Sequence, residues 1–143
     1  MISVLSPKKE VELLVAKRVD RDAVTWGFRM FLGRDPENNR VYDLYTRMRH
    51  VADFRGQLWT SQEFRIRLDE LNAPNPPRLP VDVMLNSRDA VVWGYALLFD
   101  REPENEATIV AHLKARTVGE LRRSYLKSQE FQSRFKRVVG GVS

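Results

Sequence analysis

The stretch Asp-Ala-Val-Thr-Trp-Gly-Phe at residues 22–28 decides the fold, because residues 89–95 repeat it as Asp-Ala-Val-Val-Trp-Gly-Tyr. The similarity extends outward from this stretch without a gap. Of the 48 residues from 21 to 68, 18 are identical to the residue 67 positions later. Repetition at a fixed period is typical of structural units that pack on one another. The sequence therefore predicts two tandem copies of one unit.

The repeated stretch has helical periodicity. Its apolar residues recur at i, i+3, i+4, i+7 and i+8, namely Ala23, Trp26, Gly27, Met30 and Phe31, and the second copy keeps the pattern. One amphipathic core helix is thus expected in each copy, with Trp26 and Trp93 buried. Glycine inside a helix costs about 1 kcal/mol relative to alanine. The retention of Gly27 and Gly94 therefore predicts close approach of another backbone.

Three shorter helices are expected after each core helix. Pro36 and Pro103 are predicted as the first residues of the second helix, since proline is favoured there. The capping box that starts at Thr117 predicts the start of the third helix, and Ser61 and Ser128 are predicted as N-caps of the fourth. The expected buried stripe of the second helix comprises Val41, Leu44, Tyr45 and Met48 in the first copy and Ile109, Val110 and Leu113 in the second.

The predicted fold class is all-α, because no segment shows a convincing strand pattern. Four prolines between residues 71 and 80 exclude a continuous helix there. The expected organisation is an N-terminal helix in residues 1–20, a first helical unit in 21–71, a proline-rich linker in 72–80, a second unit in 81–139 and a flexible tail in 140–143. Ser6 is expected to cap the N-terminal helix, which would bury Val11, Leu14 and Val15 against the first unit.

Composition excludes several kinds of chemistry. The 143 residues include no cysteine, so disulfides and thiolate catalysis are ruled out. The two histidines, His50 and His112, do not correspond at the repeat offset, and no metal-ligand spacing or glycine-rich phosphate loop is present. No apolar run could span a membrane, and the N-terminus lacks the features of a secretory signal. We therefore expect a cytoplasmic protein without cofactor, metal or catalytic residues.

Paired carboxylates are the one catalytic arrangement to weigh. Glu63 with Glu130, or Glu37 with Glu104, could act as an acid and base across the interface between the copies. The structural interpretation is favoured, because each glutamate is expected in the first turn of a helix, where a carboxylate stabilises the helix dipole.

Certain polar and turn residues are kept in both copies and are expected to form a structural motif. Arg34 and Arg101 are predicted to contact the glutamate or backbone of the Ser-Gln-Glu-Phe turn in their own copy, since arginine and glutamate are retained together. The motif comprises Arg34, Pro36, Glu37, Ser61, Glu63 and Phe64 in the first copy and Arg101, Pro103, Glu104, Ser128, Glu130 and Phe131 in the second.

These motifs resemble those of a bacterial helical domain family of unknown function, whose signature is an aromatic helix ending in Leu-Gly-Arg-x-Pro followed by a Ser-Pro-Glu-Phe turn. Such domains are accessory modules of glycosyltransferases and methyltransferases of surface-polysaccharide pathways, and are distantly similar to phycobilisome linker domains. Gln62 and Gln129 replace the family's proline, and Asp100 replaces its glycine. The resemblance covers both copies and implies an accessory or assembly role without catalytic residues.

The sequence therefore predicts a non-catalytic protein–protein interaction or assembly module, with a virion component as an alternative. A net charge of +5 leaves nucleic-acid binding as a less favoured alternative. The basic face for that role would comprise Arg122, Arg123, Lys127, Arg134, Lys136 and Arg137. Aromatic and arginine side chains dominate binding hot spots. The candidate partner-binding residues are accordingly Arg40, Arg47, Arg49 and Trp59, with Trp59 expected to be exposed.

Overall fold

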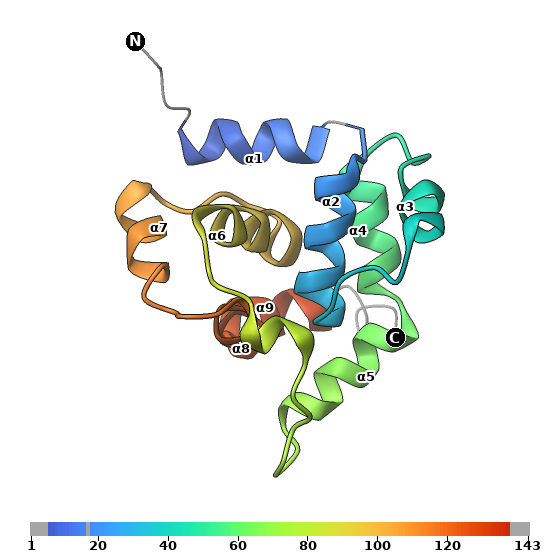
Figure 1. Ribbon diagram of the computed structural model, residues 1–143. Helices are drawn as coiled ribbons and strands as arrows, with labels where there is room; N and C mark the ends of the chain where they lie inside the picture. Colours follow the sequence, from blue (N-terminus) through green and yellow to red (C-terminus); the bar gives the residue numbers. More distant parts are fainter. Residues whose placement is uncertain (1–5, 17, 138–143) are drawn as a thin grey trace.

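The computed structural model describes residues 6–16 and 18–137, and every regular element in these ranges is a helix (Figure 1). The elements are α1 (Pro7–Ala16), α2 (Arg21–Gly27), the π-helical η1 (Phe28–Leu32), α3 (Asn39–Tyr45), α4 (Val51–Trp59), α5 (Gln62–Leu71), the 3-10 helix η2 (Pro80–Val83), α6 (Arg88–Gly94), the π-helical η3 (Tyr95–Phe99), α7 (Glu106–His112), α8 (Val118–Lys127) and α9 (Gln129–Phe135). The all-α prediction is confirmed.

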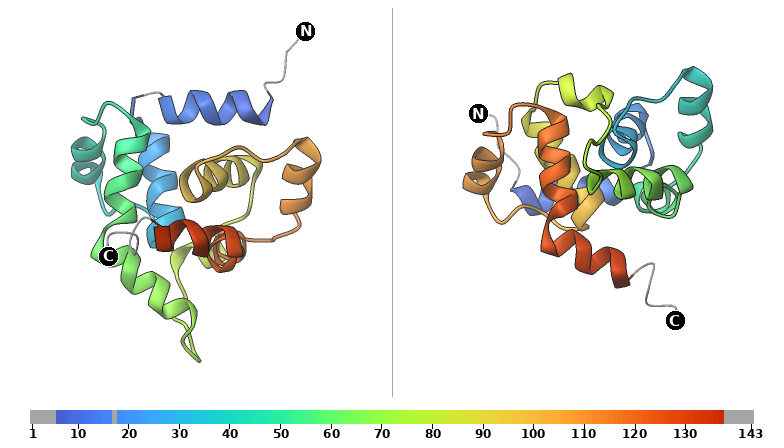
Figure 2. Two further views of the ribbon diagram at one scale, coloured as in Figure 1. Left: turned by 180° about the vertical axis from the view of Figure 1, so that it is seen from behind. Right: turned by 90° about the horizontal axis from the view of Figure 1, so that it is seen from below.

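The helices of residues 21–71, the first half, and of residues 81–137, the second half, follow one another in the same order. Each element from α2 to α5 begins 67 positions before an element of the same kind: α2 and α6, η1 and η3, α3 and α7, α4 and α8, α5 and α9. The segments η1 and η3 contact each other, and α2 contacts α6. The halves therefore share one hydrophobic core, with α3 and α7 at opposite edges of the molecule (Figures 1 and 2).

The N-terminal helix α1 packs on both halves. It contacts α4 of the first half as well as α6 and η3 of the second (Figure 2). Ser6 caps it as predicted, accepting a hydrogen bond from the Lys9 amide at 3.3 Å, and Val11 is buried. The predicted packing on the first unit is present through α4, and α1 additionally packs on the second half, where Glu10 pairs with Arg88 of α6 at 2.8 Å. The side chains of Leu14 and Val15 lie outside the described residues.

Each core helix ends in a π-helical turn that the sequence periodicity did not predict. The residue after this turn is left-handed in both halves, with φ of 73° at Gly33 and 54° at Asp100. Glycine adopts this conformation without steric cost, and aspartate is among the few other residues that tolerate it. Of the two core-helix tryptophans, Trp93 is buried as expected, whereas Trp26 is only partly buried.

The two core-helix glycines face aromatic rings. A Cβ atom at Gly27 would lie 2.5 Å from the ring of Phe54 on α4, and one at Gly94 would lie 2.6 Å from the ring of Tyr125 on α8. Such separations are shorter than carbon contacts allow. The close approach is therefore real, but a side chain makes it, and the expected backbone contact is wrong.

The second helix of each half begins later than predicted. Pro36 and Pro103 lie in the turns before α3 and α7, and Asn38 and Asn105 are the N-caps. Their side chains accept hydrogen bonds from the backbone amides of Val41 and Thr108. Amides in the first turn of a helix have no acceptor within the helix, so these caps satisfy them. The predicted stripes are only partly inside the protein. Ile109 is buried, but Leu44, Val110 and Leu113 are exposed.

The linker and the last helix of each half agree with the prediction. No helix passes through residues 74–79, and η2 begins at Pro80. Ser61 and Ser128 cap α5 and α9, accepting hydrogen bonds at 3.2 Å from the amides of Phe64 and Phe131. The expected tail, residues 140–143, and the end of the second unit, residues 138 and 139, lie outside the described residues.

An aromatic cluster joins the two halves where α4, α5 and α9 meet. Its members are Phe31, Trp59, Phe64, Phe131 and Phe135. The ring centroids of Phe31 and Phe64 are 4.9 Å apart, and those of Trp59 and Phe131 are 5.2 Å apart. Edge-to-face aromatic pairs of this kind contribute beyond their buried area. The cluster therefore ties the last helix of the second half to the first half.

Candidate binding site

The motif arginines and glutamates form a bidentate ion pair in each half. Arg34 donates through Nε and Nη2 to the two carboxylate oxygens of Glu63 at 2.8 and 2.9 Å. Arg101 does the same with Glu130 at 2.7 and 2.8 Å. The tie that the sequence predicts is therefore present in both halves. Because these arginines are occupied inside their own half, they serve the fold, and no free anion site exists at these positions.

The paired carboxylates are unsuited to acid catalysis. The hydrogen bond from Arg34 lowers the pKa of Glu63, and the hydrogen bond from Arg101 lowers the pKa of Glu130. The pKa of Glu104 is lowered as well, first by a hydrogen bond from its own backbone amide. A general acid needs a raised pKa, so these groups have the opposite electrostatics. Each glutamate is also held by an arginine of its own half, including Glu37 by Arg34 at 2.5 Å.

The four candidate partner-binding residues do not form one surface. Arg40 lies on α3, while Arg47 and Arg49 follow that helix, and all three are exposed. Trp59 is only 9% exposed because it belongs to the aromatic cluster. The expectation that Trp59 is an exposed aromatic is therefore wrong. Periodicity on a short helix could not show that α9, from the far end of the chain, covers it.

The predicted basic face is also interrupted. Arg122 is 1% exposed and donates at 2.8 Å to the carbonyl oxygens of both Met30 and Phe31 at the end of η1. Burial lowers its pKa to about 10, so it remains charged at neutral pH but cannot reach a nucleic acid. Arg123 is paired with Asp82 at 2.5 Å. The structure thus removes two members of the face proposed for nucleic-acid binding.

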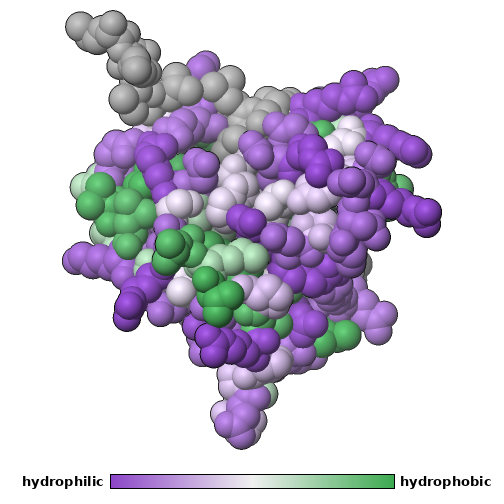
Figure 3. Space-filling model, in the orientation of Figure 1, coloured by the Kyte–Doolittle hydropathy of each residue, from purple (hydrophilic) through white to green (hydrophobic). Residues whose placement is uncertain are grey.

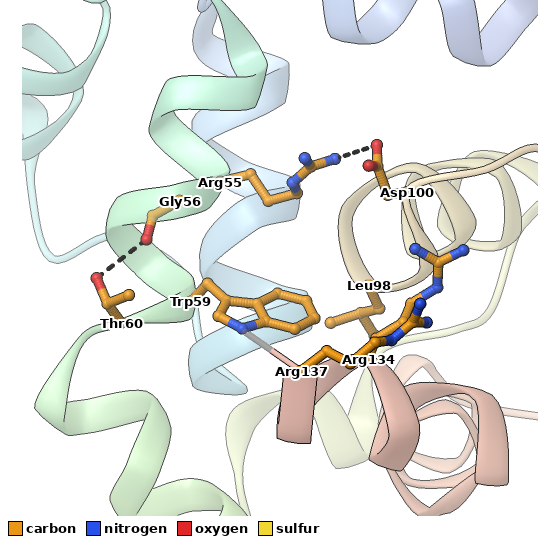
Figure 4. Close-up of a pocket in the computed structure, with 8 residues that line it drawn as sticks. All are labelled: Arg55, Gly56, Trp59, Thr60, Leu98, Asp100, Arg134 and Arg137. Atoms are coloured by element: carbon orange, nitrogen blue, oxygen red, sulfur yellow. Dashed lines mark hydrogen bonds and ion pairs between the residues drawn. The ribbon is translucent and has the colours of Figure 1, made fainter. Parts of the chain in front are cut away.

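Three arginines instead converge in a cleft between the halves, here called the arginine cleft. Its lining includes Arg55 and Trp59 of α4, Leu98 and Asp100 from the region of η3, and Arg134 and Arg137 from the region of α9, and its volume is about 380 Å³. Figure 4 shows Arg134 and Arg137 reaching towards the side of the cleft where Arg55 meets Asp100, with the Trp59 indole between the two groups of side chains. Nη1 of Arg55 lies 2.6 Å from Oδ1 of Asp100.

Sequence reasoning missed the central position of Arg55 in this cleft. A usable signal was present, because Arg55 is identical to Arg122 and Arg67 is identical to Arg134 at the repeat offset. Two arginines kept in both copies without a capping role indicate a shared place in the structure. Which of them is open to solvent depends on contacts between the halves, and periodicity carries no information about those.

A second feature is an apolar patch on the second half, made of Val83, Leu85, Val110 and Leu113. Their exposed fractions are 66%, 84%, 63% and 40%. The segment that carries Leu85 runs beside the end of α7, since the Asn86 side chain donates to the carbonyl oxygens of His112 and Ala115. Figure 3 shows apolar residues gathered over α7 and towards η2 on this face of the molecule.

His112 lies in an aromatic group with Tyr95 and Tyr125. Its Nε2 is 3.3 Å from the Tyr95 hydroxyl, and burial lowers its pKa. The Tyr125 hydroxyl is buried without a hydrogen-bond partner in the described structure, and burial raises its pKa. A hydroxyl that is closed to solvent cannot meet a substrate, so this group is best explained as packing around Gly94.

Among residues 6–16 and 18–137 no group of three or more histidine or acidic side chains could hold a metal ion. Within the same ranges, no helix has the length and apolar character needed to cross a bilayer. No protein-family model matches the chain, and comparisons with curated proteins and with solved structures found no similar protein. The resemblance to the bacterial accessory domain therefore remains a prediction.

Proposed function

We propose that the protein is a tandem duplication of one helical unit and acts as a non-catalytic protein–protein interaction or assembly module. The matching order of elements and the paired Arg34–Glu63 and Arg101–Glu130 contacts support the duplication. The apolar patch supports the interaction role. Scattered apolar residues are normal on protein surfaces, but a gathering of large ones is typical of a partner site.

The patch is a property of the second half alone. Val110 and Leu113 correspond to Asp43 and Thr46 on α3, which are polar. A unit of this kind therefore folds without large apolar residues at these positions. This difference between the halves is the observation that carries the proposal, because side chains that the fold does not need are available for a partner.

Affinity capture from the native host tests the role, using the wild-type chain and a Leu85→Glu/Val110→Glu variant as baits. We expect the variant to lose at least about tenfold in affinity for the captured partner, since charge in the centre of an apolar interface costs more than about 1.4 kcal/mol. Sedimentation equilibrium of both chains shows whether the partner is a second copy.

Leu44→Glu is the matched control, because Leu44 is 58% exposed on α3, the counterpart of α7. It should leave capture and self-association unchanged. Equal capture by the wild-type and double-variant baits, with no change in self-association, would contradict the proposal. So would turnover of a sugar nucleotide or methyl donor by the purified chain.

A further inference from the structure

The arginine cleft has a counterpart at the other junction between the halves. Arg55, Arg134 and Arg137 correspond, at the offset of 67 residues, to Arg122, Arg67 and Glu70. These three line a second pocket of about 320 Å³, closed on one side by linker residues that include Leu79. The same framework therefore builds two pockets that differ in the residues at their rims.

In the second pocket the chain supplies its own carboxylates. Arg67 donates to both carboxylate oxygens of Glu70 at 2.5 Å. Asp82 of η2 accepts a hydrogen bond from the backbone amide of Leu79 and pairs with Arg123. Arg67 and Arg123 are thus each paired with a carboxylate of the same pocket, whereas Arg78, which also lines it, is exposed.

The arginine cleft lacks a counterpart of the Arg67–Glu70 pair. Arg137 stands where the second pocket has Glu70, so Arg134 has no glutamate three residues after it. The closest carboxylate to Arg134 is Glu130 at 3.7 Å, and Glu130 is already bound by Arg101. Asp100 is engaged by Arg55. Arg134 therefore shares its carboxylate with Arg101, and within the described residues Arg137 forms no ion pair.

The cleft also contains apolar surface. Leu98 and the Trp59 indole line it beside the arginines. Such surface suits the methylene groups of an acidic side chain whose carboxylate pairs with the guanidinium groups.

We propose that the arginine cleft binds a carboxylate of a partner polypeptide, in the place that Glu70 takes in the second pocket. Within this chain, Arg67 of the second pocket binds the carboxylate of Glu70. This pair shows which chemical group the cleft would accept. A nucleic-acid strand fits less well, because it needs several phosphate contacts along a continuous basic track, and Asp100 interrupts the arginines of the cleft. This inference rests on the proposed interaction role, because that role makes a partner protein the source of the carboxylate.

The test titrates the full chain with acetylated, amidated hexaglutamate and follows the assigned indole N–H resonance of Trp59 by NMR. Inorganic phosphate and a thymidine decanucleotide form two parallel arms. Arg137→Glu rebuilds in the cleft the pairing of Arg67 with Glu70. It should therefore weaken hexaglutamate binding by roughly tenfold or more, the loss expected for one charge-assisted contact.

Arg65→Glu is the matched control, because it makes the same change in net charge at an exposed position of α5 outside the cleft and should leave the dissociation constant unchanged. A saturable shift of the Trp59 resonance that Arg137→Glu removes, and Arg65→Glu does not, supports the site. The proposal is overturned if both variants lose the same hexaglutamate affinity or if hexaglutamate causes no shift. It is also overturned if phosphate or the decanucleotide binds more tightly at this site. The apolar-patch variants leave the cleft untouched, so either proposal can fail while the other stands.

Discussion

Arg55 of α4 and Arg122 of α8 occupy corresponding positions, and each reaches into the opposite half to bind the π-helical segment there. Arg122 is buried and donates to two carbonyl oxygens of η1 at 2.8 Å. Arg55 remains partly exposed, donates to the carbonyl oxygen of Ala96 at 3.3 Å and pairs with Asp100. The same side chain is therefore a buried tie at one junction and part of an open cleft at the other.

The difference comes from the residue after each π-helical turn and from the path of the linker. Gly33 leaves room for Leu79, whose side chain would lie 2.5 Å from a Cβ at that position. The linker therefore covers the Arg122 side, and burial follows. On the Arg55 side no described segment takes the place of the linker, and Asp100 supplies a carboxylate instead. The connection between the halves thus decides which of two corresponding arginines becomes structural.

The largest expected effect compares these arginines directly. Arg122→Ala should lower the free energy of unfolding by about 3–5 kcal/mol, because it removes a buried, hydrogen-bonded charge and leaves two carbonyl groups unpaired. Arg55→Ala should cost only about 1 kcal/mol, since its pair is partly exposed. Urea unfolding of both variants measures the difference. Similar losses would show that burial does not distinguish the two junctions.

An intermediate effect compares the core-helix glycines with a glycine that has free space. Gly27→Ala and Gly94→Ala should each destabilise by about 1–3 kcal/mol, because the added methyl group would overlap the Phe54 or Tyr125 ring. Gly56 of α4 has no atom within 4 Å of its would-be Cβ. Gly56→Ala should therefore stabilise the chain by about 0.5–1 kcal/mol. Thermal melts with the same sign for all three substitutions would refute the packing argument.

The smallest expected effect concerns the two bidentate ties and their pH dependence. Because the pKa values of Glu63 and Glu130 are lowered in the folded state, their contribution is complete above the ordinary value of 4.5 and is lost as pH falls through the lowered pKa. Glu63→Gln and Glu130→Gln should each cost about 1 kcal/mol at neutral pH.

Unfolding measured from pH 7 downward through the acid range checks this expectation. Each glutamine variant should lose less stability than the wild type over that range. If the variants and the wild type lose the same amount, the ties contribute nothing that depends on ionisation.

Local features of the fold could be predicted from the sequence. The helical period identified the core helices, and the serine caps at Ser61 and Ser128 identified α5 and α9. The Arg34–Glu63 tie followed from joint retention in two copies. In contrast, α3 and α7 start later than predicted, because Asn38 and Asn105, which follow the prolines, are the N-caps.

The candidate sites were harder to predict, because they depend on contacts between distant segments. Arg122 and Met30 are 92 residues apart in sequence, so nothing local indicates that this arginine is buried. Trp59 was expected outside for the same reason. On a helix as short as α7, periodicity cannot show which face is covered, so Val110 and Leu113 were assigned to the core although they are exposed.

The aromatic cluster has an evolutionary consequence. In this chain Phe64 packs on Phe131 of the other half, and the carbonyl groups of each π-helical segment accept hydrogen bonds from an arginine of the other half. A single unit would lack both of these contacts. If the chain arose by fusion of two such units, as the proposed duplication requires, the ancestral unit would have needed a second copy to supply these contacts, as in a symmetric homodimer. Fusion would then have removed that symmetry and allowed the Arg122 and Arg55 junctions to diverge.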